Sequence, residues 1–245
     1  MNNKEILKKK ANETYLNNRK TYSGIIETAA NASRVYHDLP EIDFYPANEN
    51  MNNVTLMNTD AVSAITKLDE TDLCVLNFAS FTHPGGNFLG GAMAQEEALC
   101  HSSTLYNILE QKTDFYSRNN TDTKRGLYGN HAIYTPSVLF FTENGNKTAS
   151  VITCAAPNRT RAQKENIPDQ CIDLALERRI IFMYLIAKNE KVKTLLLGAW
   201  GCGVFGNDPK EVCKLLLKHR PQGMKIVFAI PDKKNYDAFY AAMYS

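Results

Sequence analysis

The apolar positions along the chain follow two spacings, and their alternation predicts the secondary structure. Short and nearly continuous apolar runs predict buried strands, at residues 54–57, 73–78, 133–141, 151–155, 194–198 and 225–230. Apolar positions three and four apart predict helices, at residues 60–68, 94–109, 168–188, 209–218 and 235–244. Strands that alternate with helices are typical of a mostly parallel sheet covered on both faces. The pattern therefore predicts an α/β fold.

The first part of the chain has a different pattern. Residues 4–30 are polar with scattered apolar positions, which predicts surface helices laid on a core. Residues 40–53 form a looser stretch with two prolines and several asparagines. The chain shows no internal repeat and no low-complexity segment. We therefore expect a single domain of residues 1–245, with residues 1–50 as an N-terminal helical extension packed on it.

Charge and cysteine usage exclude several classes of protein. Net charge is +2 from 28 basic and 26 acidic residues, so no strong field indicates nucleic acid or a membrane surface as a partner. No apolar run approaches the ~20 residues that would span a bilayer. The six cysteines include no Cys-x-x-Cys pair, which favours reduced thiols in a cytoplasmic protein. The five histidines show no metal-binding spacing, so we expect no metal and no cofactor.

A glycine-rich loop follows the predicted strand 194–198. It places four glycines within residues 198–206, and Asp208 and Pro209 suit the start of the next helix. Such a loop presents backbone N–H groups, and a helix N-terminus adds a partial positive charge. The loop therefore predicts a site for phosphate groups, formed by Gly201, Cys202, Gly203, Val204, Phe205, Gly206 and Asn207.

The same glycines also match a dinucleotide-binding fingerprint. Gly201, Gly203 and Gly206 have the spacing of Gly-x-Gly-x-x-Gly in nicotinamide-dependent enzymes. That fingerprint expects an acidic residue at the end of the next strand, whereas Asp232 comes late, beyond Pro231. An oxidoreductase with a Rossmann-like loop therefore remains an alternative.

A second set of glycines, at positions 85, 86, 90 and 91, follows the predicted strand 73–78. Glu96 and Glu97 come next, in the first turn of a helix, where either could simply complement the helix dipole. Consecutive helical residues point about 100° apart, so only one of the two can aim fully at a given atom. Their position at the same end of the sheet as the phosphate loop favours a catalytic role.

At these residues the chain resembles a known family. Pro84-Gly85-Gly86 followed by Gln95-Glu96-Glu97 is similar to the signature of bacterial-type poly(ADP-ribose) glycohydrolases. Further similar stretches, spread over about residues 54 to 240, are Asn58-Thr59-Asp60, residues 76–80, Ala155-Ala156-Pro157-Asn158 and residues 197–207. One position departs from the family, because Asn87 stands where a third consecutive glycine is usual. Asparagine tolerates positive φ better than most residues, so the loop is expected to keep its path.

The resemblance implies a macrodomain-like fold: a three-layer α/β/α arrangement with a mixed, mostly parallel central sheet and extra N-terminal helices. ADP-ribose would lie across the carboxyl ends of the strands. Asp60 would bind the adenine amino group, the loop of residues 201–207 would hold the diphosphate, and Phe205 would pack on the ribose. The remaining implied contacts to the distal ribose or the loop above it are Asn77, Gly85, Gly86, Asn87 and Gln95.

The resemblance also implies the chemistry. Glu97 would protonate the departing oxygen as the bond to C1″ breaks, while Glu96 would bond the ribose hydroxyls. A general acid at neutral pH needs a raised pKa, which burial and the neighbouring Glu96 charge would have to supply. The substrate would be ADP-ribosylated protein or poly(ADP-ribose), acted on by a monomer.

Two alternatives to this enzyme remain open on sequence. A non-catalytic ADP-ribose-binding module would keep the cleft and lose the chemistry, and the nicotinamide-dependent oxidoreductase would leave Gln95-Glu96-Glu97 unexplained. Within the hydrolase class, poly(ADP-ribose), single ADP-ribose on a side chain and O-acetyl-ADP-ribose are not distinguished.

Overall fold

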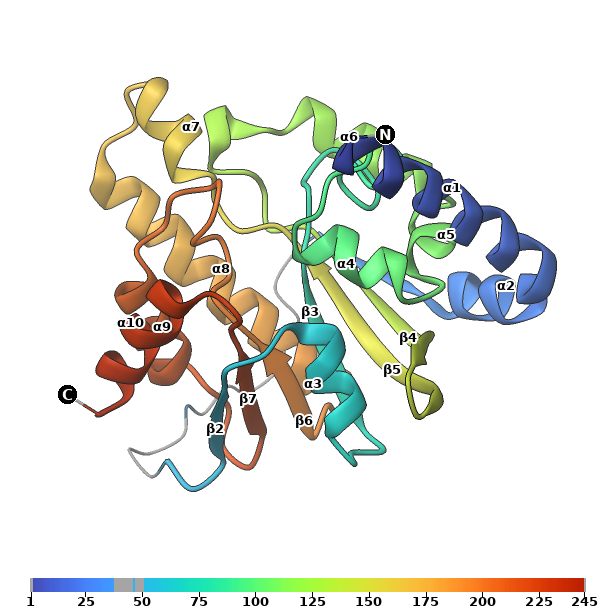
Figure 1. Ribbon diagram of the computed structural model, residues 1–245. Helices are drawn as coiled ribbons and strands as arrows, with labels where there is room; N and C mark the ends of the chain where they lie inside the picture. Colours follow the sequence, from blue (N-terminus) through green and yellow to red (C-terminus); the bar gives the residue numbers. More distant parts are fainter. Residues whose placement is uncertain (1, 38–45, 47–50, 245) are drawn as a thin grey trace.

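The computed structural model describes residues 2–37, 46 and 51–244 (Figure 1). The strands of this part of the chain form one sheet in the order β1-β4-β5-β3-β6-β7-β2. Neighbours from β5 to β2 run parallel, whereas β4 is antiparallel to both β5 and β1. The strands are β1 (Arg34–Tyr36), β2 (Val54–Met57), β3 (Leu73–Phe78), β4 (Ala132–Thr142), β5 (Gly145–Cys154), β6 (Thr194–Leu197) and β7 (Lys225–Ala229).

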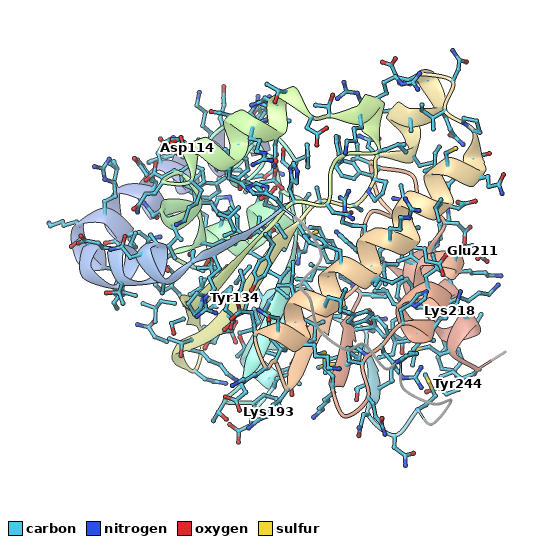
Figure 2. All side chains as sticks on the ribbon, turned by 180° about the vertical axis from the view of Figure 1, so that it is seen from behind. Asp114, Tyr134, Lys193, Glu211, Lys218 and Tyr244 are labelled. Atoms are coloured by element: carbon cyan, nitrogen blue, oxygen red, sulfur yellow. The ribbon has the colours of Figure 1, made fainter. Side chains whose placement is uncertain are left out.

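Helices cover both faces of this sheet. On one face lie α1 (Asn3–Thr21), α2 (Ser23–Ala32), α3 (Ala61–Lys67), α4 (Gln95–His101), α5 (Leu105–Leu109) and α6 (Thr113–Thr121). On the other lie α8 (Asp169–Asn189), α9 (Pro209–Lys218) and α10 (Lys233–Tyr244). Seen from behind, α8 crosses the sheet diagonally beside α9, which carries Glu211 and Lys218 (Figure 2). Two short helical segments, η1 (Lys124–Gly126) and α7 (Arg159–Lys164), lie in the connections.

Strand β3 shows why the apolar runs are nearly continuous. Cys74 and Leu76 pack in the cluster that contains α8, whereas Leu73 and Val75 pack in the cluster on the opposite face. A strand buried on both faces needs apolar side chains in both directions. The predicted three-layer α/β/α fold with a mixed, mostly parallel sheet is therefore confirmed.

The predicted helix 94–109 is wrong in one respect, because it is interrupted between α4 and α5. Thr104 N–H donates to the Leu139 carbonyl at 3.0 Å, and Phe141 N–H donates to the Ser102 carbonyl at 2.8 Å. The end of β4 therefore takes the backbone groups that a continuous helix would use. Apolar positions keep helical spacing across the break, so the sequence pattern does not reveal it.

Other departures concern short or polar elements. The surface helices expected in residues 4–30 are α1 and α2, separated at Tyr22. The rest of the expected N-terminal extension falls mainly on residues 38–45 and 47–50, outside the described residues. Sequence reasoning missed β1, α6, η1 and α7, which are too short or too polar to produce a clear apolar period.

Strand polarity brings the two glycine loops together. Because β3 and β6 are parallel neighbours, the loops that follow them leave the same edge of the sheet. Lys193, directly before β6, marks the opposite edge at the bottom of Figure 2. The fold therefore brings the residues after Phe78 close to the residues after Leu197.

Candidate active site

A cavity of about 560 Å³ opens at the carboxyl ends of β3, β6 and β7. Six of the predicted binding residues line it: Asp60, Gln95, Gly201, Gly203, Val204 and Phe205. Most other lining groups are small or apolar, among them Phe78, Met93, Ala156, Trp200 and Ile230. An apolar cavity with few polar groups is typical of a small-molecule site.

The loop after β6 presents unpaired backbone donors to this cavity. Among the described residues, none accepts a hydrogen bond from the N–H groups of Gly203, Val204 and Phe205. Val204 lines the cavity and is 87% exposed. Consecutive free N–H groups form a concave site for an anion. The loop is therefore suited to a phosphate group, with Val204 available to cover the ligand.

Three other predicted residues of this loop shape it and do not line the cavity. Asn207 is buried, and its Nδ2 donates to the carbonyls of Pro157 and Gly201 at 2.9 and 3.2 Å. Burial raises the pKa of Cys202 to about 12, so its thiol stays neutral. A methyl group at Gly206 would lie 2.5 Å from Oγ1 of Thr160, so this position requires glycine. These residues hold the loop in place.

Phe205 is half-buried and lines the cavity. Its carbonyl accepts a hydrogen bond from Thr160 N–H at 3.1 Å, and Thr160 Oγ1 donates to the Val204 carbonyl at 3.3 Å. Thr160 lies in α7, which sequence reasoning missed. The available signal was Asn158, whose side chain accepts from Arg161 N–H at 2.9 Å and so begins this helix.

Asp60 lines the cavity at the start of α3, of which it is the N-cap. It accepts from Ser63 N–H at 2.9 Å and from Ser63 Oγ at 2.6 Å. Burial raises the pKa of Asp60, but the bonds from Ser63 outweigh it and hold that pKa below its ordinary value. Asp232 and Asn235 line the same cavity, although the sequence predicted no role for Asn235. The cavity therefore offers carboxylate acceptors.

Glu97 closes the loop that carries Gly85, Gly86, Gly90 and Gly91. Its Oε1 accepts from Asn87 N–H at 2.9 Å, and its Oε2 accepts from Ala94 N–H at 3.0 Å. The residue is only 6% exposed. One carboxylate therefore ties the middle of this loop, at Asn87, to its end at Ala94.

Glu96 points towards β3 instead. Its Oε1 accepts from Asn77 Nδ2 at 3.1 Å and its Oε2 from Ser80 N–H at 2.6 Å, with 3% of the residue exposed. Burial raises the pKa of Glu96 to about 8, the negative charge of Glu97 adds to this, and the hydrogen bonds oppose it. The Glu96 carboxyl therefore retains its proton near neutral pH.

The two carboxyls converge beneath Gly86. A methyl group there would lie 2.5 Å from Glu97 Oε1 and 3.1 Å from Glu96 Oε2. The backbone φ angles of Gly85 and Gly86 are 64° and 62°, in the region that favours glycine. The side chains leave the helix in different directions, as their 100° separation requires, yet both border the same turn.

The position of Asn87 does not depend on positive φ. The positive φ values of this loop fall at Gly85, Gly86 and Gly91, and not at Asn87. The Asn87 side chain is exposed and lies against Gly90. The loop therefore accommodates asparagine because this position adopts a backbone angle open to any residue, which corrects the expected reason.

Gln95 and Asn77 act as supports. Gln95 Oε1 accepts from Phe78 N–H at 2.9 Å, and its Nε2 donates to the Leu76 carbonyl at 2.8 Å, so both amide ends tie α4 to β3. Asn77 is fully buried, and its Nδ2 also lies 3.3 Å from Oγ1 of Thr153. These side chains position the glutamates.

Metal-binding clusters, membrane-spanning helices and disulfides were sought in the described part of the chain. Within residues 2–37, 46 and 51–244 no group of three or more His, Cys, Asp or Glu side chains could hold a metal ion. In the same residues no helix is both long and apolar enough to cross a membrane. All six cysteines are free thiols.

Comparison with known proteins places this geometry among ADP-ribose enzymes. The family model described as "Microbial-type PARG, catalytic domain", where PARG stands for poly(ADP-ribose) glycohydrolase, matches residues 3–143. No curated protein sequence matches the chain.

Similar solved structures cover nearly the whole chain. The poly(ADP-ribose) glycohydrolase of Thermomonospora curvata has a TM-score of 0.82 and 28% identity, over 97% of this chain and 99% of that one. The same enzyme bound to the inhibitor ADP-HPD has a TM-score of 0.80 and 27% identity over the same shares. The Deinococcus radiodurans enzyme in complex with ADP-ribose has a TM-score of 0.76 and 29% identity, over 89% and 97%.

Proposed function

Because the chain belongs to the microbial-type poly(ADP-ribose) glycohydrolase family, we propose that its cavity binds ADP-ribose and that Glu97 is the proton donor. The predicted family is confirmed, and with it the enzyme class, a glycoside hydrolase acting on ADP-ribose. The oxidoreductase alternative has no support in these relationships. A binding module without turnover is disfavoured, because both glutamates remain in a buried, hydrogen-bonded arrangement.

The ligand placement follows the polarity of the site. The free N–H groups of Gly203, Val204 and Phe205 fit the diphosphate, and Asp60 fits a hydrogen-bond donor such as the adenine amino group. The distal ribose would lie between Phe205 and the turn at Gly85 and Gly86. Supporting this placement, a Deinococcus enzyme with a TM-score of 0.76 to this chain is known in complex with ADP-ribose.

In the proposed reaction, Glu97 would act first as an acid and then as a base. Glu97 transfers its proton to the departing oxygen as the C1″–O bond breaks, and the diphosphate stabilises the positive charge that develops on the ribose. Water then adds to C1″ and returns its proton to the Glu97 carboxylate. Glu96, bonded to Asn77 and Ser80, is the deeper group and would orient the ribose hydroxyls.

One observation carries this proposal: two buried carboxyls meet beneath Gly86, and Gln95, directly before them in the chain, lines the same cavity as the loop with free N–H groups. Calorimetry with ADP-ribose tests the binding part, and one site per chain is expected. Bound ligand should stabilise the fold by RT ln(1 + [L]/Kd), about 2.7 kcal/mol at one hundred times Kd. Absence of binding at millimolar ADP-ribose would remove the proposal.

The substrate, cellular location and oligomeric state of the enzyme are part of the same proposal. It would act as a cytoplasmic monomer on poly(ADP-ribose) or ADP-ribosylated protein, without a metal or cofactor. Incubation with poly(ADP-ribose), a mono-ADP-ribosylated peptide and O-acetyl-ADP-ribose, with released ADP-ribose as the readout, separates the three substrates. Size-exclusion chromatography with light scattering tests the oligomeric state.

A further inference from the structure

One aromatic side chain connects the two glycine loops. Tyr128, just after η1, stacks on Phe81 with ring centroids 4.4 Å apart and planes 13° apart. It also lies tilted against Phe205, at 6.2 Å and 58°. Phe81 belongs to the loop after β3, and Phe205 to the loop after β6. Tyr128 is thus a bridge between the carboxyl pair and the proposed diphosphate site.

The Phe81 end of this bridge is rigid. The residue before it, Ser80, donates its N–H to Glu96 Oε2 at 2.6 Å. The Phe81 carbonyl accepts from Nδ2 of the buried Asn119 at 2.8 Å, and the Phe81 ring is itself buried. A ring stacked on Phe81 is therefore positioned relative to Glu96.

The backbone of Tyr128 is held in an unusual conformation. Its φ is 60°, a left-handed value that is disfavoured for a residue with a side chain. Arg179, in α8 and only 1% exposed, donates to the carbonyls of Tyr128 and Leu127 at 3.1 and 3.4 Å. It also donates to Oδ1 of Asn130 at 2.8 Å and to the Ala155 carbonyl. These contacts hold the segment in the conformation that places the ring between the loops.

The Phe205 end has weaker restraints, because its half-buried ring packs only partly against the core cluster that contains α8. Gly203 and Gly206 flank it in the loop, and Thr160 bonds only the main chain of this segment. Flanking glycines permit many backbone conformations. The tilted contact with Tyr128 therefore restricts the orientation of the Phe205 ring.

We propose that Tyr128 is a positioning residue, whose ring holds Phe205 at the distance from Glu96 and Glu97 at which the reacting ribose fits. This inference rests on the proposed function of the site. A ribose held loosely would spend less time with its C1″–O bond next to Glu97, and misplacement of about 1 Å can cost 10²-fold in rate.

Two substitutions at Tyr128 distinguish the effect of the ring from the effect of the backbone conformation. Tyr128→Gly removes the ring and suits a φ of 60°, so the fold is retained, whereas Tyr128→Phe keeps the ring. With the substrate that the parent cleaves fastest, Tyr128→Gly should lower kcat roughly 10-fold or more. Tyr128→Phe should stay within about two-fold of the parent. Should Tyr128→Gly not fold, Tyr128→Asn replaces it, because asparagine also tolerates positive φ.

A double-mutant cycle with Phe205→Ala is decisive. If Tyr128 acts through Phe205, adding Tyr128→Gly to Phe205→Ala should lower kcat by less than about two-fold further. If the fold-losses in kcat of Tyr128→Gly and Phe205→Ala multiply in the double variant, the proposal is overturned. Equal kcat of Tyr128→Gly and the parent would also overturn it. If the parent itself bound no ADP-ribose in calorimetry, the proposed function would fail. If the parent binds and the losses multiply, only the role of Tyr128 fails.

Discussion

The carboxylate of Glu97 accepts a hydrogen bond at 2.9 Å from the backbone N–H of Asn87, in the glycine loop that follows β3. Its other oxygen accepts from Ala94 N–H at the far end of the same loop. The proposed acid is therefore also the group that holds its own loop closed. Substitutions at this residue affect chemistry and loop geometry together, and the choice of substitution decides which effect is measured.

Glu97→Gln keeps the size of the side chain and removes the acid. Turnover should fall roughly 10²-fold or more, since general acid catalysis contributes about 10²–10⁴. The amide NH₂ would face the N–H of either Asn87 or Ala94, so about 1–3 kcal/mol of stability should also be lost. ADP-ribose affinity should change little.

Side-by-side kinetics, calorimetry and urea unfolding on Glu97→Gln and Glu96→Gln test this prediction. Glu96→Gln is the matched control, for which we expect a milder loss of turnover and a larger effect on binding. Equal activity of Glu97→Gln and the parent on every cleavable substrate would leave Glu97 as a loop-closing residue only.

Gly86→Ala should abolish activity, because its methyl group would lie 2.5 Å from Glu97 Oε1. Positive φ alone costs an alanine about 1–2 kcal/mol. Gly223→Ala provides the control, since Gly223 has φ 79° with nothing within 4 Å of the added methyl. Both variants should lose stability, and only Gly86→Ala should lose turnover. Unchanged turnover in Gly86→Ala would show that the carboxyls can move without consequence.

Phe205→Ala should weaken ADP-ribose binding roughly 10-fold, because the ring lines the cavity beside the proposed ribose position. The ring also packs partly against the core cluster that contains α8, so a modest loss of stability accompanies it. Calorimetry and thermal unfolding measure the two effects. A large drop in Tm with unchanged ADP-ribose affinity would identify Phe205 as a core residue.

The raised pKa of Glu96 predicts a dependence of stability on pH. Its pKa is about 4.5 in the unfolded chain and about 8 when folded, so the folded state binds more protons between these values. The free energy of unfolding contributed by this group should therefore fall as pH rises from about 4.5 to about 8, and level off above. Urea unfolding of the parent and of Glu96→Gln across this range measures it. The variant should lack this contribution, and identical slopes for the two proteins would contradict the prediction.

The sequence by itself determined the layers of the fold and the two loops. Strands buried on both faces must be apolar throughout, so runs such as residues 73–78 and 194–197 are visible without a structure. Glycines cluster where the main chain needs positive φ or close approach, as at Gly86 and Gly206, and these clusters indicated the site.

Only the tertiary structure decided how the site residues act. Gln95 and Asn77 were expected to act at the distal ribose or the loop above it, and the structure adds that their amides also support β3 and Glu96. The break between α4 and α5 depends on β4, which is distant in sequence. Tyr128 contacts Phe81 and Phe205, and Arg179, fifty-one residues later, donates a hydrogen bond to its backbone carbonyl. Such contacts depend on distances between segments remote in the chain, whereas residue spacing reports only on neighbours along it.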